Sequence, residues 1–308
     1  MTAPAEEWRS RPHSRSGDTT VARTAPEKDI RISPEVQANS QWRPAEGILG
    51  GIVREAEERA RVLELRRPEL ETDAEETLSG PSLVRALRGN TVAVIGEVKR
   101  RSPSKGAIDD SLDAVTQANA YVDGGAVAVS ILTEPNHFGG SAADLRRVRA
   151  GVSVPVLKKD FHVAPVQLLE ARALGSSAAL LIARAVAPAR LDELMDFARL
   201  IGLETLVEVR DEDELRRALG AGATLIGVNN RDLESLEIDP DTAARLLPLI
   251  PAGMLAIAES GVTSRADVER YAVRGADAVL VGSALSAASD PVAATRALSN
   301  VPRRQRGG

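Results

Sequence analysis

The chain contains no cysteine and only three histidines. Disulfides, thiolate metal sites and cysteine nucleophiles are therefore excluded, and the composition is compatible with a reducing cytosol. His13, His137 and His162 are scattered without the spacing of metal ligands, so we expect no metal centre. We expect a cytoplasmic location.

Long apolar runs are also missing. No window holds the roughly 18 consecutive apolar residues of a membrane-spanning helix, and no apolar segment follows the N-terminal arginines. The net charge of −5 argues against nucleic acid or an anionic membrane as the main partner. Local basic clusters still bind small anions, so the composition favours small-molecule chemistry.

The chain has 308 residues, of which 43% are hydrophobic, and this is ample material for a large core. Residues 1–44 are rich in Arg, Ser, Thr and Pro, and we expect them to form a disordered N-terminal extension. Residues 45–296 read as one domain that opens with an amphipathic helix ending near Pro68. Residues 297–308 form a short basic C-terminal tail.

Within that domain, short apolar runs alternate with amphipathic segments at intervals of roughly 20 to 30 residues, which is typical of βα units. The pattern predicts strands at 92–98, 126–132, 154–159, 178–182, 205–209, 224–228, 254–258 and 278–281. It predicts helices at 112–123, 141–149, 165–174, 188–201, 211–219, 239–247, 264–274 and after 283. Because no GxGxxG turn follows a strand, we predict a single (β/α)8 TIM barrel rather than a doubly wound sheet.

The C-terminal ends of barrel strands form the active-site face, and charged side chains gather at these positions. Glu97, Glu208 and Glu259 lie inside or directly against apolar runs. Burying a carboxylate costs several kcal/mol unless it is paired. Lysines at the ends of the first and third predicted strands are the candidate partners.

Two glycine-containing segments after the last two predicted strands, "AESGVTS" and "LVGSALS", suit a phosphate group. Gly261 and Gly282 allow close backbone approach, and Ser260 and Ser283 add hydroxyl donors. Further candidates for this anion site are Ser102, Lys105 and Arg231.

From about Ala45 to the region of Pro291, the chain resembles the indole-3-glycerol phosphate synthase family. The resemblance rests on "EVKRRSPSKG", "SILTEPNHFGGS", "PVLKKDF", "QLLEARALG", "LVEV", "IGVNNRDL", "AESGV" and "VGSAL", in the family's order. It implies ring closure, decarboxylation and dehydration of 1-(2-carboxyphenylamino)-1-deoxyribulose 5-phosphate in tryptophan biosynthesis, with no metal or cofactor. The implied partner is this phosphorylated small molecule, while monomer and homodimer both remain open.

The resemblance also implies a role for each matching residue. Lys159 matches the general acid of ring closure, and Lys99 matches the lysine that contacts the substrate carboxylate and assists dehydration. Glu208 and Glu97 match acid/base carboxylates. Asn229 and Glu259 match residues that orient the substrate and the lysine, and Phe138 and Phe161 match apolar walls around the aromatic ring. The polar and phosphate-holding positions are matched by Ser102, Arg231, Ser260, Gly261, Gly282 and Ser283.

The chain departs from the family pattern at a few positions without an assigned chemical role. Gly96 stands where alanine is usual, His137 stands where other residues are common, and "GSSAALL" replaces "GADAVLL". Lys158 matches a position that is not catalytic.

Two other functions are weighed against this one. A different phosphate-binding barrel, such as a ribulose-phosphate epimerase or a thiazole-forming enzyme, would lack the first-strand motif. A non-catalytic barrel retained for binding or regulation would have no need of Lys159 and Glu208 together.

Overall fold

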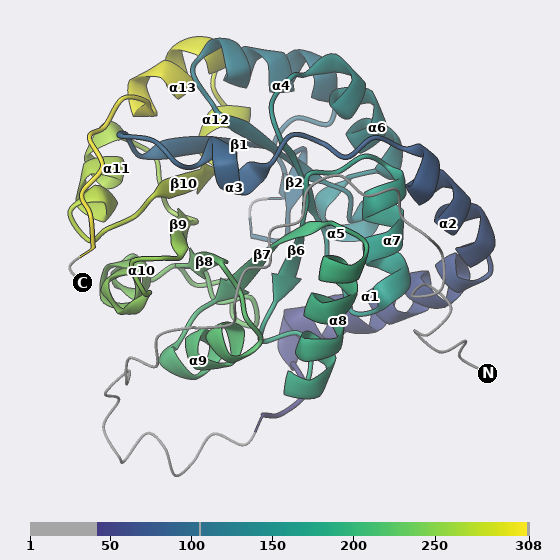
Figure 1. Cartoon of the computed structure of the whole chain (residues 1–308). Helices are drawn as coiled ribbons and strands as arrows, with labels where there is room; N and C mark the ends of the chain where they lie inside the picture. Colours follow the sequence, from purple (N-terminus) through teal and green to yellow (C-terminus); the bar gives the residue numbers. More distant parts are fainter. Residues whose placement is uncertain (1–41, 105, 307–308) are drawn as a thin grey trace, which may run out of the picture. The chain divides into compact units, whose positions relative to one another are not determined.

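The computed structural model describes residues 42–104 and 106–306. Eight parallel strands form a closed barrel in the order β1-β10-β9-β8-β7-β6-β5-β4, so the predicted TIM barrel is confirmed (Figure 1). The strands are β1 (Ala93–Val98), β4 (Ala128–Leu132), β5 (Val156–Lys159), β6 (Ala178–Ile182), β7 (Glu204–Val209), β8 (Leu225–Asn229), β9 (Leu255–Glu259) and β10 (Ala278–Val281).

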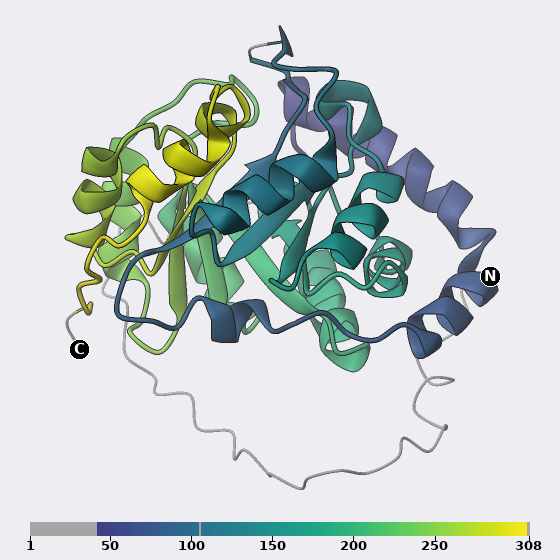
Figure 2. The same cartoon turned by 90° about the horizontal axis from the view of Figure 1, so that it is seen from above.

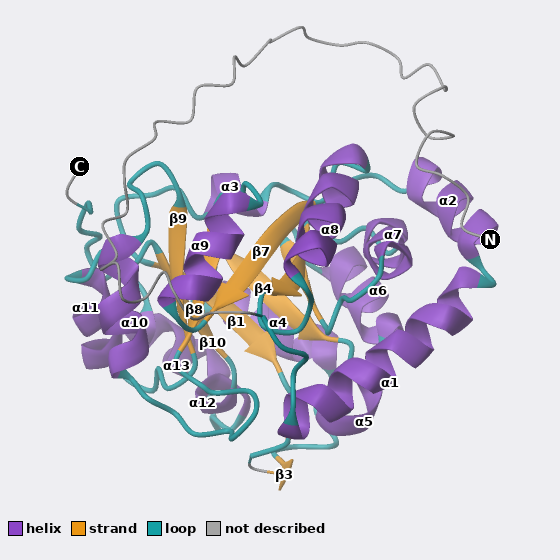
Figure 3. Ribbon diagram, turned by 90° about the horizontal axis from the view of Figure 1, so that it is seen from below, coloured by secondary structure: helices purple, strands orange, loops and turns teal. Residues whose placement is uncertain are grey.

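The strands lie inside a ring of helices, as Figure 3 shows. Aspartate or serine caps several of these helices: Asp113, Asp211, Ser264 and Asp290 each accept a hydrogen bond from a backbone N–H three residues on. The helices that follow the strands are α4 (Ala114–Asp123), α6 (Ala142–Gly151), α7 (Pro165–Ala173), α8 (Pro188–Leu200), α9 (Glu212–Gly220), α10 (Asp241–Leu246), α11 (Arg265–Ala272) and α13 (Pro291–Leu298).

The strands that carry polar residues at their C-terminal ends differ from the prediction by one or two residues at their boundaries. β5 begins after Pro155, because proline has no N–H to donate to the ladder. β8 and β9 each run one residue further than predicted, and Asn229 pairs in register with Glu259. Both polar residues therefore belong to the sheet itself, which holds their side chains on rigid backbone.

The expected N-terminal helix is two helices, α1 (Gly47–Glu64) and α2 (Arg67–Glu76). Pro68 lies in the first turn of α2, where a missing N–H costs nothing. The prediction placed one helix ending near Pro68 and missed α2. Leu70 of α2 packs in a buried cluster with Val166 and Leu169 of α7, which fixes this pair of helices to the barrel's outer wall (Figure 2).

The prediction also missed short elements in the loops, because each is too short to show the hydrophobic periodicity of a helix or strand. They are α3 (Leu83–Ala86), α5 (Pro135–Phe138), the 3-10 turn η2 (Leu247–Leu249) and the hairpin of β2 (Arg101–Ser102) with β3 (Gly106–Ala107). The helical segment predicted after 283 is two helices, α12 (Ser283–Ser286) and α13. The hairpin lies in the loop after β1, where the sequence reads "RRSPSKGA".

At the N-terminal end, the proposed extension 1–44 falls almost entirely outside the described residues. At the C-terminal end, α13 ends at Leu298, and Arg303 and Arg306 then form ion pairs with the buried Asp277 at 2.6 and 2.9 Å. Through the part of the chain that the structure describes, no helix is long and apolar enough to cross a membrane.

Candidate active site

A pocket of about 1260 Å³, including its open mouth, lies at the C-terminal ends of the strands. Every residue that the sequence assigned to catalysis or substrate binding lines this pocket, although the residues come from positions between 97 and 283. Lys105, a further anion candidate, lies outside the described residues. The barrel's topology explains the convergence, because parallel strands bring their C-terminal ends to one face.

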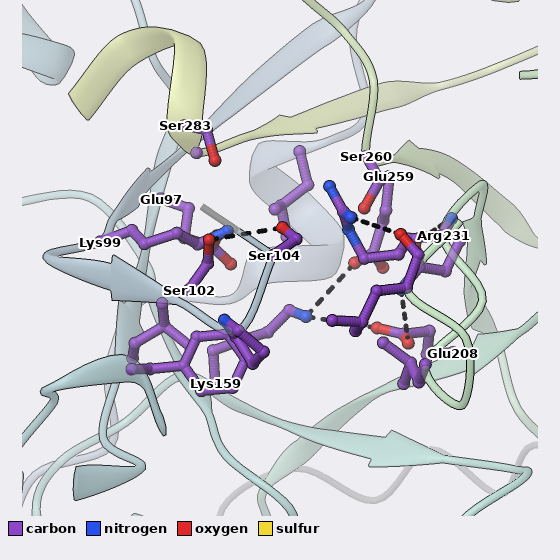
Figure 4. A pocket seen from close by; sticks show the side chains of 18 of the residues that line it. Glu97, Lys99, Ser102, Ser104, Lys159, Glu208, Arg231, Glu259, Ser260 and Ser283 are labelled. Atoms are coloured by element: carbon purple, nitrogen blue, oxygen red, sulfur yellow. Dashed lines mark hydrogen bonds and ion pairs between the residues drawn. The ribbon is translucent and has the colours of Figure 1, made fainter. Parts of the chain in front are cut away.

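The ammonium group of Lys159, at the end of β5, lies at the centre of this cluster (Figure 4). Its Nζ lies 3.2 Å from Oε2 of Glu208 and 3.5 Å from Oε2 of Glu259. Burial disfavours the charged form, but the negative charges of Glu208, Glu259 and Glu97 outweigh it and raise the pKa of Lys159. The free site therefore holds Lys159 as a cation with a proton to give.

Glu97 and Lys99 form a second ion pair, at the end of β1. Because residues alternate along a strand, both side chains point into the mouth, and Oε1 of Glu97 lies 2.5 Å from Nζ of Lys99. Burial opposes ionisation of Glu97, but Lys99 and then Lys159 outweigh it and lower its pKa. A Cβ added to Gly282 would collide with the Glu97 carboxylate, so this glycine provides the space that the pair occupies.

Two further polar residues complete the charged floor of the pocket. Asn229 Nδ2 donates to Oε1 of Glu208 at 2.8 Å, which leaves the other carboxylate oxygen facing Lys159. Burial raises the pKa of Glu259, while the charge of Lys159 opposes the increase. Within residues 42–104 and 106–306, Oε1 of Glu259 is buried without a hydrogen-bond partner, and it packs where a side chain at Gly227 would stand.

The neighbouring Lys158 points the other way, toward the helices. Its Nζ lies 2.7 Å from Glu170 of α7 and 3.8 Å from Asp160, and the residue is almost fully buried. Burial and the charge of Lys158 lower the pKa of the adjacent His162, so that imidazole is neutral. Lys158 therefore serves the packing of β5 against α7 and does not line the pocket.

The predicted anion site lies between the loops after β9 and β10. Ser260 and Gly261 have φ values of 63° and 82°, so two successive residues adopt the left-handed conformation. Such turns leave backbone N–H groups able to face a small anion. Arg231 also lines the pocket, and its Nη1 is anchored on the carbonyl of Leu236 at 2.7 Å. The Oγ atoms of Ser102 and Ser104 lie 3.5 Å apart in the loop after β1.

The aromatic side of the pocket is held by polar contacts behind it. The rings of Phe138 and Phe161 are 6.1 Å apart between centroids. Glu134 accepts the backbone N–H groups of the α5 turn that carries Phe138. Arg59 of α1 reaches both Glu134, at 3.5 Å, and Asp160, at 2.8 Å, and so ties the two aromatic segments to α1.

Sequence reasoning missed the part of the pocket contributed by α1 and the loop after β8. The apolar face of α1 was readable, but nothing in its periodicity says that it covers a substrate pocket instead of the barrel wall. These missed lining residues include Ile48, Leu49, Ile52, Leu233, Leu236 and Ile238.

The structure also explains two departures from the family pattern. The ring of Tyr121 packs so closely on β1 that a Cβ at Gly96 would overlap it, and the Tyr121 hydroxyl lies 3.0 Å from Ser286 Oγ. His137 Nε2 lies 3.2 Å from the Glu55 carboxylate, which links α5 to α1.

Glu55, Glu134 and His137 bring three potential metal-ligand atoms within 4.8 Å of one another. Both oxygens of Glu134 already accept backbone N–H groups, and His137 is hydrogen-bonded to Glu55. These contacts explain the cluster without a metal ion: Glu134 caps α5, and His137 and Glu55 link α5 to α1.

Comparison with known proteins shows which family the chain resembles. A family model described as indole-3-glycerol phosphate synthase matches residues 49–298. The indole-3-glycerol phosphate synthase of Parafrankia sp. (strain EAN1pec) is 52% identical over 205 residues, covering 67% of this chain and 76% of the relative. Indole-3-glycerol phosphate synthase 1 of Streptomyces coelicolor is 53% identical over 208 residues, covering 68% of this chain and 77% of the relative.

Solved structures with low identity show the fold alone. 3-Hexulose-6-phosphate synthase from Salmonella typhimurium superposes with a TM-score of 0.56 at 16% identity, covering 68% of this chain and 97% of that one. The match of the family model over most of the chain identifies the family. The chain belongs to the indole-3-glycerol phosphate synthases, lyases that form indole-3-glycerol phosphate in tryptophan biosynthesis.

Proposed function

We propose that the pocket carries out the family's ring closure with Lys159 as the general acid that protonates the substrate ketone. The observation that carries this assignment is the position of its Nζ, 3.2 and 3.5 Å from two buried carboxylates at the base of the pocket. These carboxylates keep the lysine protonated until the ketone oxygen arrives. The developing alkoxide then lies beside a cation that is already in place.

Lys99 holds the substrate carboxylate in this proposal. It is the second ammonium group at the mouth, and Glu97 beside it neutralises its charge in the free site. A carboxylate that binds Lys99 lies near Lys159, with the aromatic ring toward Phe138 and Phe161 and the phosphate toward Ser260, Gly261 and Ser283.

The final dehydration requires a base for the carbon-bound proton and an acid for the leaving hydroxyl. Glu97, which its lysine neighbours keep ionised, is assigned the base. Glu208 is assigned the acid: Asn229 orients it, and Lys159, which holds it as a carboxylate in the free site, is neutral once it has protonated the ketone. Glu97→Gln and Glu208→Gln should then both accumulate the ring-closed intermediate after a single turnover.

The fluorescence of the indole product provides the test of function. Trp8 and Trp42, the two tryptophans, precede the barrel in sequence, so their emission forms a constant background. Fluorescence should rise with time when the authentic substrate is added to the full chain, and the Lys159→Ala variant should bind substrate without this rise. Calorimetric binding of the substrate to folded wild-type protein with no turnover would contradict the proposal.

Assembly and location remain parts of this proposal. Action in the cytoplasm as a monomer or a homodimer accords with a pocket whose assigned residues all come from one chain. Analytical ultracentrifugation distinguishes the two assemblies. Residues 1–44 are proposed to be dispensable for turnover, so a chain lacking residues 1–40 should keep unchanged kinetics.

A further inference from the structure

The reaction takes up one proton from solution in each turnover when the substrate carboxylate is ionised. The departing ketone oxygen needs two protons to become water, the substrate's CH2 group supplies one, and the carboxylate leaves as CO2 without any. Lys159 and Glu208 are the proposed donors, and their side chains in the floor of the pocket are only 13% and 3% exposed. A substrate bound across the mouth covers them, so the missing proton needs a route that does not cross the substrate.

A second pocket meets the active site from the side, between the β6–α8 and β8–α10 loops. It shares Glu208, Asn229 and Leu49 with the main pocket and continues past Arg184 and Glu234 toward the first turn of α9. We call it the side pocket; it encloses about 580 Å³ including open solvent. Glu208 thus lines both pockets, and in the proposed pose the substrate lies in the main one.

The side pocket is lined by a buried carboxyl group that the proposed mechanism does not use. Glu214, in the first turn of α9, is 4% exposed, and its Oε2 accepts the backbone N–H of Arg210 at 2.8 Å. Burial, reinforced by the negative charge of Asp211, raises the pKa of Glu214 to about 7. The groups that oppose this increase are the Arg210 N–H, Arg217 and Arg184. The further charged side chains of the pocket are those of Arg210, Arg231, Asp232 and Glu234, and Arg210 pairs with Asp232 at 3.5 Å.

A carboxyl group with these properties both gains and loses a proton readily near neutral pH. A structural cap alone would explain the bond to Arg210, but it would not require the carboxyl group to line a pocket shared with Glu208. We propose that the side pocket is the proton entrance of the enzyme and that Glu214 relays one proton per turnover from solvent to Glu208. Glu214 loses its proton through water to the Glu208 carboxylate and then regains one from solvent.

Glu214→Gln tests the relay, because the amide oxygen keeps the bond to Arg210 while the side chain no longer titrates. In dilute buffer above neutral pH, kcat should fall by about tenfold or more, since general acid–base groups commonly contribute at least this much. Added imidazole at constant ionic strength should restore kcat by supplying protons through the side pocket. The matched control is Glu212→Gln, also in the first turn of α9, whose carboxylate pairs with Arg245 and does not line the side pocket. It should show neither effect.

The relay rests on the proposed role of Glu208, so Glu208→Gln is measured beside it. Loss of dehydration in Glu208→Gln together with an imidazole-rescued defect in Glu214→Gln supports the relay. Wild-type turnover by Glu214→Gln, or a defect that imidazole does not relieve, overturns it even if Glu208 is essential. Full activity of Glu208→Gln instead overturns the dehydration role and, with it, the relay. If Glu214→Gln fails to fold, Glu214→Met, which also has no titrating group, serves in the same assay, and a rate independent of imidazole there also overturns the relay.

Discussion

Lys158 and Lys159 are adjacent in the chain, but their ammonium groups are held by carboxylates on opposite sides of β5. Lys158 lies 2.7 Å from Glu170 of α7, and Lys159 lies 3.2 Å from Glu208 inside the barrel. The alternation of side chains along a strand produces this separation. One lysine therefore contributes to packing and its neighbour to the pocket, and the two make separable predictions.

Lys158→Met should destabilise the protein without removing its chemistry. The change leaves Glu170 without its cation in a mostly buried position, which typically costs about 3 kcal/mol. Adding Glu170→Leu should recover much of this loss, because the pair is then replaced by apolar packing. Urea denaturation measures the stability, and kcat/KM of the folded fraction should stay near the wild-type value. A stable but inactive Lys158→Met variant would contradict the assignment.

Gly282→Ala should damage catalysis more than stability. The added Cβ would displace the Glu97 carboxylate, and it would lie 3.1 Å from Nζ of Lys99. Misplacing catalytic groups by about 1 Å commonly costs about 100-fold in rate, so kcat/KM should fall to that extent. The matched control is Gly253→Ala, whose Cβ meets no atom within 4 Å and which should keep wild-type kinetics. Equal rates for the two variants would show that Gly282 does not shape the site.

Gly96→Ala should lower the free energy of unfolding by about 1–3 kcal/mol, the usual cost of an overpacked core. Its methyl group would overlap the ring of Tyr121, which is fully buried between α4 and β1. Thermal and urea unfolding measure the effect. Retention of wild-type stability would mean that β1 or α4 shifts easily to make room for the methyl group. The alanine that is usual in the family at this position would then be accommodated in the same way.

The pH dependence of stability reports on Glu214. Burial raises the pKa of its carboxyl group from 4.5 to about 7. The unfolded chain therefore releases this proton at lower pH than the folded protein, and the free energy of unfolding falls as pH rises between these values. The loss should amount to about 3 kcal/mol, at 1.36 kcal/mol per pKa unit.

Glu214→Gln cannot titrate and should lack this fall, so its stability relative to wild type should increase with pH up to about 7 and then level off. Urea unfolding at a series of pH values measures the difference, with Glu212→Gln as the control. A difference that does not vary with pH would show that the folded carboxyl group titrates at its ordinary value.

Most of the barrel and of the candidate site could be predicted from the pattern of strands and from the polar residues at their ends. Glu97, Lys99, Lys159, Glu208 and Glu259 end or follow apolar runs, and the barrel topology then requires them to meet. These residues could be identified from local sequence, because the apolar run and the charged residue lie within a few positions of each other.

What could not be predicted depends on contacts between distant segments. The cover of α1 over the pocket needs Arg59 to meet Asp160, a pair 101 residues apart. The side pocket needs the β6–α8 and β8–α10 loops to meet beside α9, where Arg184 contacts Glu234, a pair 50 residues apart. The glycine at 96 has its explanation in Tyr121, on the helix that follows.

The most direct test of the account compares product formation by Lys159→Ala with that by Lys158→Met, followed through indole fluorescence under single-turnover conditions. The account predicts that folded Lys159→Ala binds the substrate but forms no indole product, whereas folded Lys158→Met forms it at a rate near that of the wild type. Product formation by Lys159→Ala at the wild-type rate would contradict the claim that this lysine is the acid of ring closure.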